Sequence, residues 1–111
     1  MRDGRQDTRP QFDANTAPWA EFISKVHGDS KTVPLPLSGE CDLVFIDGDH
    51  SYEGTRADVT RYGPLVRIGG RIVFHDHDHI PITRVIGEEL ATGCWAVTRC
   101  YMQIMSLQRV R

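Results

Sequence analysis

Two apolar runs in this sequence each end in a cluster of carboxylates and imidazoles. The run at residues 43–46 (LVFI) is followed by DGDH at 47–50, and the run at 72–74 (IVF) is followed by HDHDH at 75–79. Carboxylates and imidazoles do not stabilise the end of a buried strand, so the two clusters indicate a functional site. Their oxygen and nitrogen atoms bind divalent cations, and histidine also transfers protons near neutral pH.

The residues between the two clusters predict a strand–helix–strand unit. Residues 42–47 are rich in β-branched and aromatic side chains, which is typical of a strand buried on both faces, and residues 71–75 repeat the pattern after a Gly-Gly turn. Ser51 is a suitable N-cap for an amphipathic helix between them. Because such a crossover makes the two strands parallel, their polar ends lie at the same edge of the sheet. Asp47 and Asp76 are therefore predicted to be neighbours, on strands roughly 5 Å apart.

Turn and periodicity signals predict the rest of the chain. We expect a disordered tail at residues 1–11 and one partial α/β domain at 12–111. Asp58, inside the helix that follows Ser51, is expected to pair with Arg61 on a solvated face. The remaining elements, in chain order, are a short helix within 12–22 capped by Asn15 or Thr16, a strand at 22–27, a turn at 28–30, a connection at 31–41, a helix from Pro81 to Gly93, and two strands at 94–97 and 101–105 joined by a turn at 98–100.

Length and composition are those of one small globular domain. The 111 residues are 40% apolar and 25% charged, with a net charge of −2. That charge gives no reason to expect nucleic acid or an anionic membrane as a partner, and no apolar run approaches membrane-spanning length. The N-terminus has no secretory signal, so a cytoplasmic location is the default expectation. The cysteines Cys41, Cys94 and Cys100 lack paired CxxC spacing and fit reduced thiols.

In combination, these motifs resemble the C-terminal portion of a class I S-adenosylmethionine-dependent methyltransferase. The segments that carry the resemblance are HGDS (27–30), DLVFIDGDHSYEGTRADV (42–59) and PLVRIGGRIVFHDHD (64–78). They are most similar to a small-molecule O-methyltransferase-like family whose fourth strand ends in IDGDHSY and whose fifth strand follows a GG turn and ends in an HD pair. The resemblance covers about residues 20–108.

The resemblance implies a truncated Rossmann-like sheet, with strands similar to the third to seventh of the family, the last one antiparallel, and helices packed on the sheet. The first two strands are missing, and with them the glycine-rich loop and the acidic residue that hold the methyl donor. None of the ten glycines forms a GxG. One edge of residues 42–47 therefore lacks its partner. Our hypothesis is that residues 22–27 pair with this edge; the alternatives are that another chain or a second copy covers it, or that the fragment folds poorly and aggregates.

The resemblance also implies a metal site at the two strand ends. Asp47, His75 and Asp76 match the positions that hold a divalent cation, most often Mg²⁺, in metal-dependent relatives. A carboxylate is commoner at the position of His75, and imidazole suits softer metals, so Mn²⁺, Fe²⁺ and Zn²⁺ stay open. Asp49 and His50 occupy positions where relatives place the general base, and His50 is the better intrinsic candidate because it titrates near neutrality.

The expected ligands follow from the same resemblance. Gly28, Asp29 and Ser30 match the segment that contacts the adenine of S-adenosylmethionine, and Asp47 lies beside the donor. The cation would bind the acceptor hydroxyl, so the acceptor is expected to be a small hydroxylated molecule. The resemblance thus implies a metal-assisted O-methyltransferase that acts once a partner or an additional N-terminal segment supplies the donor loop.

Two other functions stay open at this point. The chain could be a non-catalytic methyltransferase-like fragment that serves as an interaction module, or a metal-dependent hydrolase that uses Asp47, His75 and Asp76 with a bound water. Both aspartates also have a purely structural interpretation, since aspartate commonly caps strand ends and helix N-termini. His77 and His79 are expected to be solvated loop residues.

Overall fold

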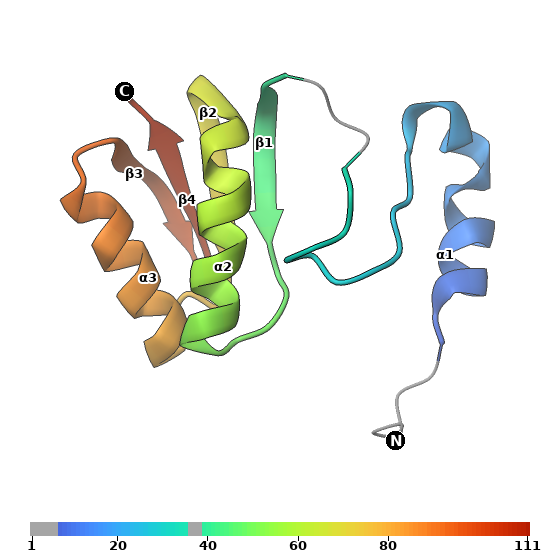
Figure 1. Cartoon of the computed structure of the whole chain (residues 1–111), viewed down its shortest axis with the longest axis horizontal. Helices are drawn as coiled ribbons and strands as arrows, with labels where there is room; N and C mark the ends of the chain where they lie inside the picture. The colour runs from blue at the N-terminus through green and yellow to red at the C-terminus, as the bar shows by residue number, and fades with distance from the viewer. Residues whose placement is uncertain (1–6, 36–38) are drawn as a thin grey trace.

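The computed structural model describes residues 7–35 and 39–111 of the chain. It is an α/β fold in which four strands form one mixed sheet of order β1-β2-β4-β3, with α2 and α3 on one face (Figure 1). No helix in the described residues has the length and apolar character needed to cross a membrane. The elements are α1 (Arg9–Thr16), η1 (Ala17–Phe22), β1 (Cys41–Ile46), α2 (Tyr52–Tyr62), η2 (Gly63–Leu65), β2 (Val66–His75), α3 (Ile80–Ala91), β3 (Trp95–Tyr101) and β4 (Ile104–Arg109).

The predicted strand–helix–strand unit is confirmed. Strands β1 and β2 pair in parallel, with Val44 opposite Ile72 and Ile46 opposite Phe74. Strand β2 begins at Val66, earlier than predicted, and includes the Gly-Gly pair as an irregularity in the ladder. Gly70 is required there, because a Cβ atom at this position would lie 2.7 Å from the carbonyl oxygen of Asp42.

The hydrophobic core lies between the sheet and the two helices. On β2, the side chains of Ile72 and Phe74 face the helices and are buried, and that of Val73 between them faces the other side. Each large apolar side chain buried in this way contributes about 1.5–3 kcal/mol. The buried apolar residues are Ile46, Val59, Val66, Ile72, Phe74, Ile82, Val85, Ile86, Trp95 and Leu107.

Helix α2 begins where the sequence predicts. The hydroxyl oxygen of Ser51 accepts a hydrogen bond of 3.0 Å from the backbone N–H of Gly54, which satisfies one free donor of the first turn. At the same end, the hydroxyl of Tyr52 donates to both carboxylate oxygens of Glu88 on α3, at 2.9 and 3.0 Å. The cap and this link fix the start of α2, and with it the loop from β1.

The hypothesis that residues 22–27 pair with residues 42–47 is wrong. Phe22 ends a 3-10 helix, and residues 23–27 have no regular secondary structure and do not join the sheet, in which β1 pairs only with β2 among the described residues. The chain turns at Asp29 instead, where the carbonyl oxygen accepts from the N–H groups of Thr32 and Val33. This turn brings Ser30 to α2, where Arg61 and Tyr62 donate to its carbonyl oxygen, and no ladder with β1 forms.

Two further boundaries differ from the prediction. Helix α1 begins at Arg9, inside the segment expected to be a tail, and residues 1–6 of that tail lie outside the described residues. Thr16 ends this helix and caps no helix start, because its hydroxyl donates back to the carbonyl of Phe12. The last hairpin turns at residues 102–103, so β3 continues through the segment predicted as the turn.

Candidate functional site

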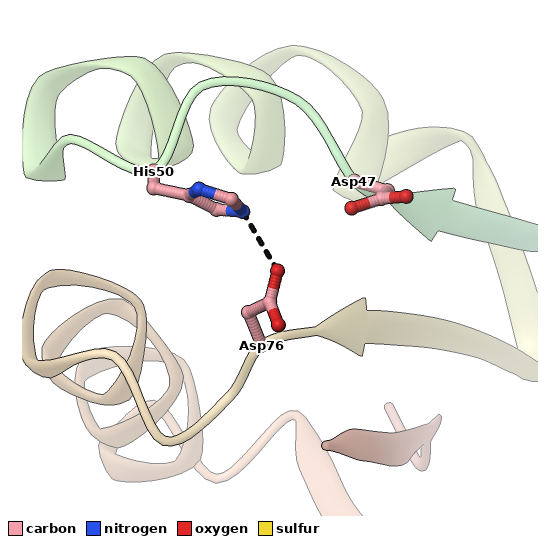
Figure 2. A group of neighbouring side chains, drawn as sticks. All are labelled: Asp47, His50 and Asp76. Carbon is pink, nitrogen blue, oxygen red and sulfur yellow. Dashed lines mark ion pairs between the residues drawn. The ribbon is translucent and has the colours of Figure 1, made fainter.

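Three polar side chains converge at the carboxyl ends of β1 and β2. Asp47 follows β1, His50 lies in the loop to α2, and Asp76 follows β2 (Figure 2). The Nε2 atom of His50 is 2.9 Å from Oδ2 of Asp76. One donor atom from each of the three residues lies within 4.8 Å of the others. The parallel pairing therefore brings Asp47 and Asp76 together, as the crossover predicts.

The backbone at Asp76 directs its carboxylate toward this cluster. Its φ angle is 59°, in the left-handed region that aspartate tolerates better than most residues. The loop that follows is held by the N–H of His79, which donates to the carbonyl of Asp76, and by the N–H of His77, which donates to Gln103 in the β3–β4 turn. The strained conformation thus persists because neighbouring segments determine it.

His75 lies between the two carboxylates of the cluster. Its Nδ1 atom is 2.8 Å from Oδ2 of Asp76 and 3.4 Å from Oδ1 of Asp47. Neither contact has the geometry of a hydrogen bond, so both are electrostatic. The Asp76 carboxylate raises the pKa of His75, and His75 in turn lowers the pKa of Asp76. The structure therefore places His75 beside both carboxylates, but the group of three donors within 4.8 Å of one another contains His50 in its place.

The two predicted general bases have different surroundings. His50 contacts Asp76 and lies against the ring of His79, with the ring centroids 4.9 Å apart. Asp49 belongs to the turn into α2, where Oδ1 accepts a 2.8 Å hydrogen bond from the backbone N–H of Ser51. That backbone hydrogen bond lowers the pKa of Asp49. Of the two, only His50 is part of the cluster.

His79 is an exposed loop residue, as the sequence predicts, and it also belongs to a second group of donors. One donor atom each of Asp76, Asp78 and His79 also lie within 4.8 Å of one another. Asp76 is common to both groups. The signal in the sequence is the alternation of histidine and aspartate at 75–79, which places several donors in one short loop.

The predicted donor-binding segment lies on the other side of β1. Ser30 and Asp47 line a cavity of about 420 Å³ together with part of β1 and α2. Asp29 is not part of its lining and stabilises its own turn by accepting from the N–H of Lys31. Gly28 does not line the cavity but allows the turn, since a Cβ there would lie 2.9 Å from the side chain of Val33. The full lining is Ser30, Val44, Phe45, Ile46, Asp47, Gly48, Asp58 and Tyr62.

Asp58 is a residue of this cavity that sequence reasoning misplaced. It is 5% exposed, and its Oδ1 atom accepts a 2.8 Å hydrogen bond from the hydroxyl of Ser30. The predicted pair with Arg61 is absent among the described contacts, because the guanidinium of Arg61 donates to the carbonyl oxygens of Ser30 and Val33. The available signal was spacing, since Asp58 lies three residues after Thr55 and shares its buried helix face.

Comparison with known proteins gives the class of this fold. The sequence matches the profile of a family described as a methyltransferase domain over residues 3–77. Since this is well over half of the 111 residues, the chain belongs to that methyltransferase family, in agreement with its resemblance to the class I enzymes.

A solved structure supports the same fold. The structure of the O-methyltransferase NovP is similar to this chain, with a TM-score of 0.74 and 19% sequence identity. The match covers 93% of this chain and 45% of NovP, so the chain spans less than half the length of that protein. No curated protein matches the sequence.

Proposed function

We propose that this chain is the metal- and acceptor-binding part of an S-adenosylmethionine-dependent O-methyltransferase that acts on a small hydroxylated molecule. The observation that carries the proposal is the convergence of Asp47, His50 and Asp76 at the ends of neighbouring strands in a member of a methyltransferase family. Sites in open α/β sheets lie at this edge.

The residues present fit a divalent cation. Two carboxylates and one imidazole offer three donor atoms within 4.8 Å of one another. Carboxylate oxygens suit Mg²⁺, and an imidazole nitrogen makes Mn²⁺ an equally good probe. In this assignment Asp47 and Asp76 hold the cation with His50, which takes the place that the resemblance gave to His75. When bound, the cation would polarise the acceptor oxygen.

His50 has a competing role as the proton acceptor. If its Nε2–H donates to Asp76, the Nδ1 atom is free to take the proton of the acceptor hydroxyl. The two roles differ in one measurable respect. A ligand contributes to cation affinity, and a base does not.

Titration of Mn²⁺ by calorimetry separates these assignments. We expect Asp47→Asn and Asp76→Asn to weaken binding by roughly tenfold or more, since each removes a charged ligand. His50→Ala should weaken Mn²⁺ binding equally if His50 is a ligand and leave it unchanged if His50 is the base. In the same way, His75→Ala tests whether His75 is a ligand, as the resemblance implies. Asp42→Asn, at the opposite end of β1, is the matched control. Equal binding by all five variants would refute the metal site.

The cavity beside Asp47 supports the binding of one end of the methyl donor. It has apolar walls from β1 and a few polar side chains, those of Ser30, Asp47, Asp58 and Tyr62, which is the usual composition of a small-molecule site. The sequence has no glycine-rich loop for the methionine end. Transfer of the methyl group therefore requires a further segment or partner that supplies this loop.

Calorimetric titration of S-adenosylhomocysteine, with and without Mg²⁺, tests donor binding by the chain itself. Micromolar binding that is lost in Asp58→Asn and kept in Asp42→Asn would establish a donor site within these residues. Absence of binding would favour the second candidate, a non-catalytic methyltransferase-like fragment. That candidate is supported by the missing GxG and by the match to 45% of NovP.

A further inference from the structure

One face of the sheet carries apolar side chains but no helix. Helices α2 and α3 lie on the same face, and no described helix covers the other (Figure 1). The pairing register places Phe45 beside Val73, and Ile104 beside Tyr101, on the uncovered side. Of these, Phe45, Ile104 and Tyr101 are 50%, 41% and 67% exposed. We call this surface the bare face; it consists of Leu43, Phe45, Val73, Tyr101 and Ile104.

The bare face also carries positive charge. A hollow of about 360 Å³ on it is lined by Arg71 and Arg99 as well as by apolar residues. Neither guanidinium makes a hydrogen bond or ion pair with a residue that the structure describes, whereas Arg67 nearby pairs with Asp42. Two cations that lack a partner among the described residues, beside an apolar floor, fit a segment that presents an acidic side chain between aromatic ones.

The N-terminal arm, residues 9–27, is a segment of this kind. No residue of α1 or η1 is buried, and Trp19 and Phe22 are 56% and 78% exposed. Glu21 lies between them in the sequence and makes no ion pair with a described residue. The radius of gyration is 15.1 Å, above the value of about 13 Å expected for a compact chain of this length. The arm therefore extends away from the domain and exposes its aromatic side chains.

The attachment of the arm favours a second copy over its own bare face. Arg61 and Tyr62 of α2 hold the carbonyl of Ser30, so the chain leaves the domain on the helix-covered side. The arm then lies beyond the free edge of β1 (Figure 1). To reach its own bare face, the segment before Ser30 would have to turn back around that edge. A second copy can be reached without this change.

We propose that the arm of one copy docks on the bare face of a second copy, and that the arm of the second copy docks on the bare face of the first. Trp19 and Phe22 enter the hollow, and Glu21 lies between Arg71 and Arg99. Helix α1, of eight residues and about 12 Å, is short enough to lie along the ten-residue strand β2. The exchange is reciprocal and closes on itself, so it forms a dimer and not a filament.

Sedimentation velocity combined with tryptophan fluorescence tests this proposal. Trp95 is buried in the core at 8% exposure, so changes in acrylamide quenching with concentration report on Trp19. We expect a dimer in which Trp19 becomes shielded as the concentration rises. Phe22→Ser, Glu21→Arg and the double variant Arg71→Glu, Arg99→Glu should each weaken the dimer by roughly tenfold or more.

A charge exchange makes the test specific. Combining Glu21→Arg with Arg71→Glu and Arg99→Glu restores the opposite charges and should restore the dimer. Ile80→Ser, at an 83% exposed site on α3, removes exposed apolar surface outside the bare face and should leave the dimer unchanged. Circular dichroism and the emission of Trp95 confirm that each variant is folded. A monomer with exposed Trp19 at all concentrations, shielding that is independent of concentration, or a dimer insensitive to the arm substitutions would each overturn the proposal.

Discussion

The domain at residues 41–109 and the N-terminal arm at residues 9–27 achieve order in different ways. Every buried apolar residue of the described structure lies in the domain, where the sheet packs against α2 and α3. The arm forms helical turns with local signals, such as Pro10 and Pro18 in the first turns of α1 and η1, and with exposed contacts such as the ion pair of Lys25 and Asp13, and its helices contain no buried residue. Local propensity thus suffices for turns, but a core needs a second layer to pack against.

The largest expected difference between the two regions concerns aromatic side chains. Phe74→Ala should lower the free energy of unfolding by about 3–5 kcal/mol, because it leaves a cavity in the core. Phe22→Ala, in dilute protein, should change it by less than about 0.5 kcal/mol, because the side chain is exposed. Urea unfolding followed by circular dichroism measures both. Similar losses for the two variants would show that the arm is packed.

A smaller effect is expected at the glycine of β2. Gly70→Ala should cost about 1–3 kcal/mol, since the new methyl group meets the carbonyl of Asp42 and the side chain of Val66. Gly87→Ala in α3 is the matched control, because a Cβ there meets nothing within 4 Å. It should stabilise the protein by up to about 1 kcal/mol through helix propensity. Thermal unfolding of both variants gives the sign of each change in stability. If both substitutions changed stability in the same direction, the close packing at Gly70 would be contradicted.

Helix caps provide the next comparison. Ser51→Ala should lower the unfolding free energy by about 1 kcal/mol, because it removes the hydrogen-bond acceptor for the N–H of Gly54. Thr16→Ala in the arm should have a smaller effect, since Thr16 caps no helix start. Urea unfolding measures both free energies. A larger loss of unfolding free energy for Thr16→Ala would mean that the arm unfolds cooperatively with the domain.

The smallest predicted effect is a pH dependence in the link between α2 and α3. The hydrogen bond from Tyr52 lowers the pKa of Glu88 below its ordinary value of 4.5. A lowered carboxyl pKa contributes stability that is fully present above the unfolded-state value and is lost as the pH falls through the folded-state value. The stability difference between wild type and Glu88→Gln should therefore narrow below about pH 4.5. Tyr52→Phe should show the same narrowing, measured by urea unfolding between pH 3 and 7; a constant difference would contradict the link.

The sequence by itself determined the centre of this protein. The apolar runs, the Ser51 cap and the handedness of parallel crossovers were enough to place Asp47 next to Asp76, and the motifs around them were enough to predict the family. These features are local or follow from a general rule of chain topology. They do not depend on how distant segments pack.

Only the tertiary structure decided the details that depend on loop geometry and on distant partners. The left-handed backbone of Asp76 brings its carboxylate to His50 as well as to His75, and no periodicity in the sequence encodes that angle. The hydrogen-bond partner of the buried Asp58 is Ser30, which is 28 residues away. Residues 22–27 look like a strand by composition, but a strand forms only where a neighbour supplies its hydrogen bonds. In the described structure these residues pair with no strand, although one edge of β1 is free, so the segment joins the exposed arm.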